Sequence, residues 1–127
     1  MIKEVAIHQF WSSFGLPAYD ENTVIDPTTG KKPKEPYITY DIVTGNLGQQ
    51  CYMNAALWYR STSWTAITEK KNEIERRFGY GEIIEEIDGG YARLWKGSPF
   101  AQRGNDPEDA GVRVYNLNYV AEFCTAD

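Results

Sequence analysis

The sequence predicts an α+β fold in which an antiparallel sheet carries two helices packed on one face. The evidence is five stretches rich in β-branched and aromatic residues, together with two stretches whose apolar residues have helical spacing. Their order reads helix, strand, strand, helix, strand, strand, strand. Elements in this order form packed layers around one core. With 127 residues, 42% of them hydrophobic, the chain is expected to form a single domain over residues 1–127.

Two helices are expected, over residues 2–14 and 64–78. Apolar side chains recur at every fourth position of the first helix, at Ile2, Ala6, Phe10 and Phe14. Trp11 lies off this row, so it either covers a rim of the core or meets a partner. The second helix carries a narrow apolar stripe formed by Trp64, Ile67, Ile74 and Phe78. Hydroxyls at 61–63 can cap its first turn.

Strands are expected over residues 37–43 and 50–60, joined by a glycine-containing turn at 44–48. One face of the second strand carries Cys51, Met53, Ala55, Leu57 and Tyr59. The other face carries Tyr52, Asn54, Ala56, Trp58 and Arg60. Both faces contain large apolar or aromatic side chains, whereas a strand with one solvent-exposed face alternates between apolar and polar residues. Because two helices cover only one face, we expect copies of the chain to cover the other.

The second half of the chain predicts a hairpin, 82–88 with 91–96, whose turn contains Gly89 and Gly90. Residues 97–103 are expected to be irregular, and a long last strand is expected over 112–123. Residues 17–36 contain four of the six prolines, so regular structure is not expected there. This connection is either a solvated surface loop or an arm that reaches a neighbouring subunit.

The charge and the cysteines limit the functional classes. A net charge of −5 and a pI of about 4.9 argue against binding nucleic acid through its phosphates, although DNA could pass without sticking. Cys51 and Cys124 have no metal-ligand spacing, and we expect both to be reduced. With no apolar signal core and no membrane span in the sequence, we expect the chain to fold in a cytosol and to bind no membrane.

A catalytic site is not expected. Four carboxylates follow the second helix, at Glu82, Glu85, Glu86 and Asp88. They could form a metal or acid–base site, a solvated strand face, or the lining of a channel that repels the DNA backbone. His8 is the only histidine and no nucleophile motif accompanies it, so it is expected to be a surface or structural residue. We therefore assign no catalytic residue, no metal ligand and no cofactor, and we expect a protein that is not an enzyme.

Residues 98–103 could instead dock on a partner, with Phe100 as an apolar anchor and Arg103 as a polar lock, or could pack on their own domain. The interface residues predicted from the sequence are Trp11, Tyr52, Trp58, Phe100 and Arg103.

Several phrases in the sequence resemble the tail-terminator, or tail-completion, proteins of long-tailed bacteriophages, which are often called minor capsid or minor tail proteins. The phrases are residues 10–19 (FWSSFGLPAY), 36–40 (PYITY), 57–64 (LWYRSTSW) and 97–103 (GSPFAQR). They are structural phrases and contain no catalytic signature. The resemblance covers most of the chain, and the loop at 20–35 is its least similar part.

The resemblance implies an α+β subunit of a ring, expected to be a homohexamer, that caps the finished tail tube and stops further addition of tube protein. Its implied partners are its own copies, the major tail tube protein and the head connector or neck proteins, and DNA passes without specific binding. It implies a place in the virion at the head–tail junction, after assembly in the host cytoplasm. The alternatives are a head-side connector subunit for head–tail joining and a small metal-dependent enzyme.

Overall fold

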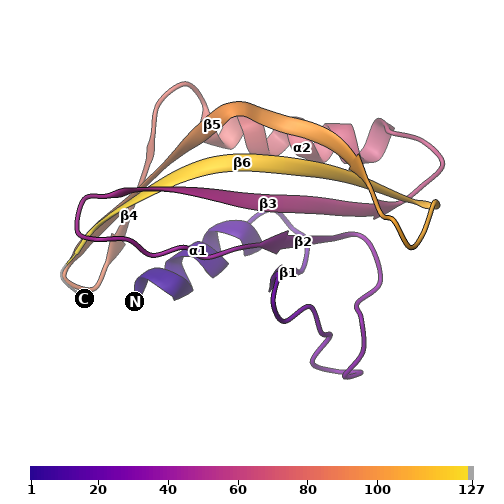
Figure 1. The fold of residues 1–127 in the computed structure, drawn as a ribbon, viewed down its shortest axis with the longest axis horizontal. Coiled ribbons are helices and arrows are strands. Elements are labelled where there is room, and N and C mark those ends of the chain that lie inside the picture. Colours follow the sequence, from indigo (N-terminus) through magenta and orange to yellow (C-terminus); the bar gives the residue numbers. More distant parts are fainter. Residues whose placement is uncertain (126–127) are drawn as a thin grey trace.

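Six strands form one curved sheet, in the order β1-β2-β3-β6-β5-β4, and two helices pack against it (Figure 1). The computed structural model describes residues 1–125. The helices are α1 (Lys3–Ser12) and α2 (Thr65–Phe78). The strands are β1 (Ala18–Asp20), β2 (Tyr37–Tyr40), β3 (Gln50–Arg60), β4 (Ile83–Ile87), β5 (Gly90–Asn105) and β6 (Val112–Cys124). The α+β class is confirmed.

The central pair of the sheet is β3 and β6, whose antiparallel register runs from Gln50 opposite Glu122 to Arg60 opposite Val112. The other neighbours are also antiparallel, except β1 and β2, which are parallel. Strand β1 lies in the connection where we expected no regular structure. Its three residues are too few to show an alternating pattern, so only its pairing with β2 defines it as a strand.

Strand β5 is longer than predicted. The expectation of an irregular segment at 97–103 is wrong, because β5 continues to Asn105 after a register shift between Lys96 and Ala101. Such a bulge accommodates extra residues without ending the strand. Gly97 lies so close to β6 that an added Cβ would be 2.9 Å from the backbone oxygen of Asn118. The Asn118 side-chain amide in turn donates to the carbonyl of Pro99 at 2.9 Å, which ties the bulge to β6.

Both helices pack on the same face of the sheet through aromatic contacts. The rings of Phe10 in α1 and Phe78 in α2 are 5.2 Å apart, and the ring of Trp11 is 5.2 Å from that of Tyr119 in β6. Trp11 has no exposed surface, so its predicted place at a rim or an interface is wrong. Ile2, which belonged to the expected apolar row, is instead 52% exposed. The buried face of α1 is therefore rotated toward Trp11.

The boundaries of α2 follow its sequence. Ile67, Ile74 and Phe78 are buried as predicted, whereas Trp64, the first residue of the predicted stripe, precedes the helix and is only partly buried. The hydroxyl of Ser63 accepts a hydrogen bond from the backbone N–H of Thr65, and the helix ends at a glycine with positive φ, Gly79.

Replacement of Trp11 by alanine tests this core. The Trp11→Ala substitution removes a completely buried ring, so it should lower the free energy of unfolding by roughly 3–5 kcal/mol. Urea unfolding measured by circular dichroism gives this value. Tyr80→Ala is the control, since this side chain is completely exposed and its loss should cost less than about 0.5 kcal/mol. Equal costs for the two variants would contradict the place of Trp11 in the core.

Candidate functional site

The face of the sheet away from the helices, called the outer face here, is not continuously apolar. Its centre is polar, and consists of Asn54, Gln102, Asn116 and Asn118 on neighbouring strands. The large aromatic side chains predicted on this face, Tyr52 and Trp58, lie toward the two ends of β3, and the pairing with β6 and β5 places amide side chains between them.

One end of the outer face is covered within the subunit. The ring of Trp58 stacks on that of Tyr37 from β2, with centroids 6.0 Å apart and planes 16° apart. Its indole N–H donates to the hydroxyl of Thr39 at 2.9 Å. Ala56, Val112 and Val114 pack beside it. Strand β2 thus supplies the stacking ring and the hydrogen-bond acceptor of Trp58, whose side chain is partly buried, and its place at an interface stays a prediction.

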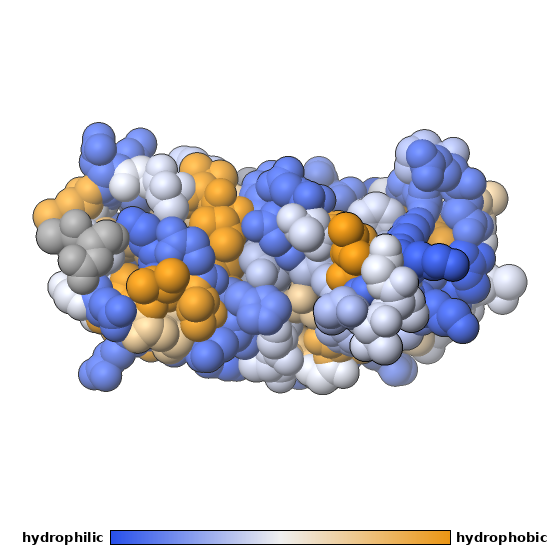
Figure 2. Space-filling model, turned by 90° about the horizontal axis from the view of Figure 1, so that it is seen from below, coloured by the Kyte–Doolittle hydropathy of each residue, from blue (hydrophilic) through white to orange (hydrophobic). Residues whose placement is uncertain are grey.

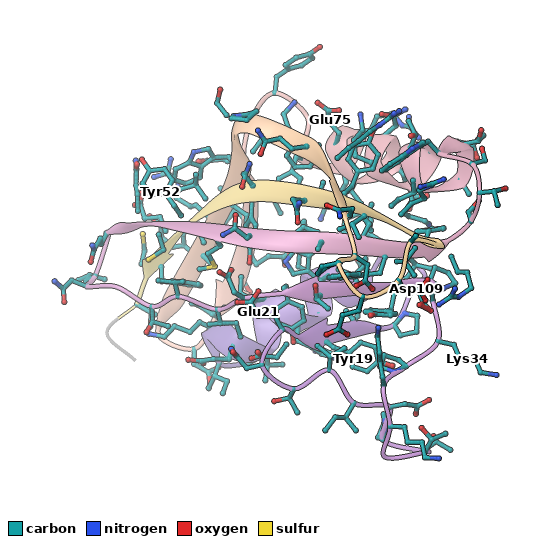
Figure 3. The ribbon with its side chains drawn as sticks, turned by 45° about the vertical axis from the view of Figure 1, so that its right-hand side comes forward. Tyr19, Glu21, Lys34, Tyr52, Glu75 and Asp109 are labelled. Carbon is teal, nitrogen blue, oxygen red and sulfur yellow. The ribbon has the colours of Figure 1, made fainter. Side chains whose placement is uncertain are left out.

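The other end of the outer face exposes aromatic and aliphatic side chains. Tyr52, Val120 and Trp95 form one row across β3, β6 and β5, in which Val120 is buried and Trp95 is partly buried. Tyr52 is 74% exposed, and Figure 3 shows it at the end of the sheet away from Asp109. Ile84 and Tyr91 on neighbouring rows are 60% and 42% exposed. Tyr52 thus remains a candidate interface residue.

Exposed apolar groups also gather outside the outer face. Figure 2 shows hydrophobic surface at the end of the molecule where the N terminus lies. The exposed apolar residues of the N-terminal segment and of the β2–β3 connection are Met1, Ile2, Val5, Val43 and Leu47.

Phe100 and Arg103 on β5 have different environments. Phe100 is 9% exposed, and its ring lies 5.6 Å from that of Phe78. The prediction of Phe100 as an anchor for a partner is wrong, since the alternative, packing on its own domain, is observed. Arg103 is exposed, its guanidinium lies 4.4 Å from the ring centre of Trp64, and its Nε donates to the hydroxyl of Tyr115 at 3.1 Å.

A second arginine shares the ring of Trp64. The guanidinium of Arg113 lies 5.4 Å from its centre and donates to the carbonyl of Thr62 at 3.2 Å. Arg103 lowers the pKa of Tyr115, chiefly because its hydrogen bond stabilises the phenolate. We call Trp64, Arg103, Arg113 and Tyr115 the arginine–tryptophan cluster. Sequence reasoning missed Trp64 and Arg113 as members, because the cluster forms only where the start of α2 packs on the paired ends of β5 and β6.

The four carboxylates that follow α2 do not form one acidic surface. Glu82 pairs with Arg93 at 2.6 Å, and Glu85 pairs with Arg77 at 3.8 Å. Asp88 pairs with the terminal amino group of Met1 at 2.6 Å. Glu85 lies opposite the buried Ala92, so it faces the helices, whereas Glu86 lies opposite Tyr91 on the outer face. Among residues 1–125, no three His, Cys, Asp or Glu side chains are grouped to hold a metal ion.

Another group of carboxylates was not predicted. Asp20, Glu21 and Asp41, called the acidic corner here, are brought together by the pairing of β1 with β2 (Figure 3 labels Glu21). Burial raises the pKa of Glu21, and the charges of Asp41 and Asp20 raise it further. Burial also raises the pKa of Asp41, although the backbone N–H of Asn54 donates to its carboxylate at 2.8 Å and opposes this shift. None of the ion pairs among residues 1–125 includes these carboxylates.

His8 and the cysteines have structural environments. The imidazole Nδ1 of His8 lies 2.8 Å from the hydroxyl of Tyr40, which links α1 to β2, and its Nε2 lies 3.3 Å from the hydroxyl of Ser12. Cys51 is buried, Cys124 is partly buried, and both are free thiols.

No known protein family, curated protein or solved structure matched this chain. In residues 1–125, neither helix has the length and apolar content needed to cross a bilayer.

The acidic corner generates a prediction about pH. Because the folded-state pKa of Glu21 is raised, its protonated form favours folding. This contribution is complete below the unfolded-state pKa of about 4.3 and is lost as pH rises through the folded-state value. The always neutral Glu21→Gln variant should therefore unfold at higher urea than wild type at pH 7, and this advantage should disappear below about pH 4.

Glu21→Lys should be at least as stable as Glu21→Gln at pH 7, because it places a cation beside two carboxylates. A Glu21→Gln protein that is less stable than wild type at pH 7 would contradict the repulsion assigned to this corner.

Proposed function

We propose that this chain is a non-enzymatic structural subunit of a long-tailed bacteriophage, and that its copies assemble into a ring at the junction of tail and head. The observation that carries the proposal is the exposed apolar end of the outer face, where the side chains of Tyr52, Ile84 and Tyr91 are open to solvent. An exposed apolar patch of this kind is typical of a surface that a partner covers. The phrases shared with tail-terminator proteins indicate that this partner is another copy.

The ring would cap the finished tail tube, stop further addition of tube protein and present a surface to the head connector. A ring requires two different surfaces on each subunit, because a head-to-tail contact repeats until it closes. The open sheet offers such a pair, since its edges are formed by different strands, β1 and β4. We expect a hexamer, as the resemblance implies.

DNA would pass through the ring without specific binding. The net charge of −5 supports this part of the proposal, because like charge repels the phosphate backbone. Of the four carboxylates proposed to line the channel, Glu86 is exposed and has no ion pair among residues 1–125. Glu82, Glu85 and Asp88 are partly neutralised by their cationic partners, so their contribution to this repulsion would be smaller.

The assembly test uses the purified chain and purified tail tubes. Light scattering and negative-stain images should reveal rings, and the protein should bind one end of each tube and block the addition of tube protein. A protein that stays monomeric at high concentration and does not bind tail tubes would contradict the proposal. Recovery of the protein on purified heads, with none on tails, would assign it to a head-side connector instead.

A pair of tyrosine variants tests the surface that carries the proposal. Tyr52→Ser should weaken ring assembly by about tenfold or more, because it removes an aromatic contact from the interface. Tyr80→Ser is the matched control, since Tyr80 is also exposed but lies in the α2–β4 connection. Size-exclusion chromatography with light scattering, at a series of concentrations, measures the change. If the two variants assemble equally well, Tyr52 is not part of the interface.

A further inference from the structure

The arginine–tryptophan cluster carries positive charge without a matching carboxylate. None of the ion pairs among residues 1–125 includes Arg103 or Arg113. The Nε of Arg113 is also buried without a hydrogen-bond partner in the described part of the chain. Trp64 directly precedes α2, whose first turn contains no acidic residue. The positive end of the helix dipole therefore adds to the charge of the two arginines.

Two carboxylates near the arginines are already engaged in other ion pairs. The hollow beside Trp64 and Arg113 is bordered by the 104–110 segment, which contains Asp106 and Asp109. Asp106 pairs with Lys32 at 3.8 Å, and Asp109 pairs with Arg60 at 2.5 Å. The pKa of Asp109 is accordingly lowered, mainly by its hydrogen bond from Arg60. These two acids neutralise other cations, and Glu108, which also borders the hollow, forms no ion pair with either arginine.

The cluster lies at an open edge of the sheet. Strand β4 pairs with β5 only from Gly90 to Leu94. Among residues 1–125, the later part of β5, which contains Arg103, has β6 as its one strand neighbour. A strand with one neighbour leaves backbone groups free on its outer side, and such an edge is a ready place for another chain to bind.

The opposite edge of the sheet carries the opposite charge. The acidic corner lies at β1 and β2, across the sheet from β5. The charges of Asp41 and Asp20 raise the pKa of Glu21, and none of the three carboxylates forms an ion pair among residues 1–125, so an arriving cation would relieve their repulsion. A guanidinium suits this task because its planar fork matches the two oxygens of a carboxylate.

We propose that the arginine–tryptophan cluster of one copy binds the acidic corner of the next copy, with Arg103 facing Glu21. The inference rests on the proposed ring and identifies the contact that builds it. Since the two surfaces lie at opposite edges of the subunit, each copy uses one surface toward each neighbour. The contact is therefore head-to-tail, as ring closure requires.

A charge exchange tests the contact. Arg103→Glu and Glu21→Arg, each alone, place like charges opposite one another and should weaken assembly by at least about tenfold. The double variant restores opposite charges, so its assembly should return to within about threefold of wild type. Concentration-dependent light scattering measures assembly, and circular dichroism melting of each monomer shows whether the variant folds. Glu21 is exposed, so Glu21→Arg gives a readout even if Arg103→Glu impairs folding.

The control is Arg76→Glu, which reverses an exposed arginine in the last turn of α2, outside both surfaces. It should assemble as wild type does. If wild type forms rings and both single reversals form them equally well, this contact is wrong, but the proposed ring function stands. Single reversals that weaken assembly without rescue in the double variant would overturn the pairing of Arg103 with Glu21. If the wild-type protein remains monomeric and does not cap tail tubes, the proposed ring function itself is wrong.

Discussion

The fold depends on an aromatic cluster that holds both helices on the same face of the sheet. Phe10 and Trp11 of α1 meet Phe78 of α2 over Tyr119 of the central strand β6. Aromatic side chains bury more area than any other type, and their edge-to-face contacts favour one arrangement over its alternatives. Because this cluster occupies one face, the outer face is left to the side chains of the strands themselves.

No helix in residues 1–125 covers the outer face, and its side chains differ along its length. At one end, Trp58 is covered by Tyr37 of the same subunit. In the centre, the amide groups of side chains such as Asn54 and Asn118 can be hydrated, so they need no covering partner. The end around Tyr52 leaves aromatic surface exposed. An assembly built from such a subunit would use separate patches at the ends and edges of the sheet, instead of one continuous apolar face.

Charge is divided between the two edges in a way that the net charge of −5 does not reveal. In the acidic corner, the charges of Asp41 and Asp20 raise the pKa of Glu21, while at the opposite edge Arg103 lowers the pKa of Tyr115. A contact between the two surfaces brings opposite charges together and gives the acidic corner a cationic partner. The proposed contact between copies thus follows from electrostatics, and the apolar end around Tyr52 adds burial to it.

The sequence alone determined the helices, the long strands, the turn at Gly89 and the buried stripe of α2, because these depend on local periodicity and turn chemistry. It did not determine β1, the rest of β5 or the environments of Trp11, Trp58 and Phe100, because burial depends on what another element places beside a residue. The candidate surfaces needed the tertiary structure most of all. The pairing of β1 with β2 brings Asp41 near Asp20, and that of β5 with β6 places Arg103 opposite Tyr115, and no spacing along the chain reports register between distant strands.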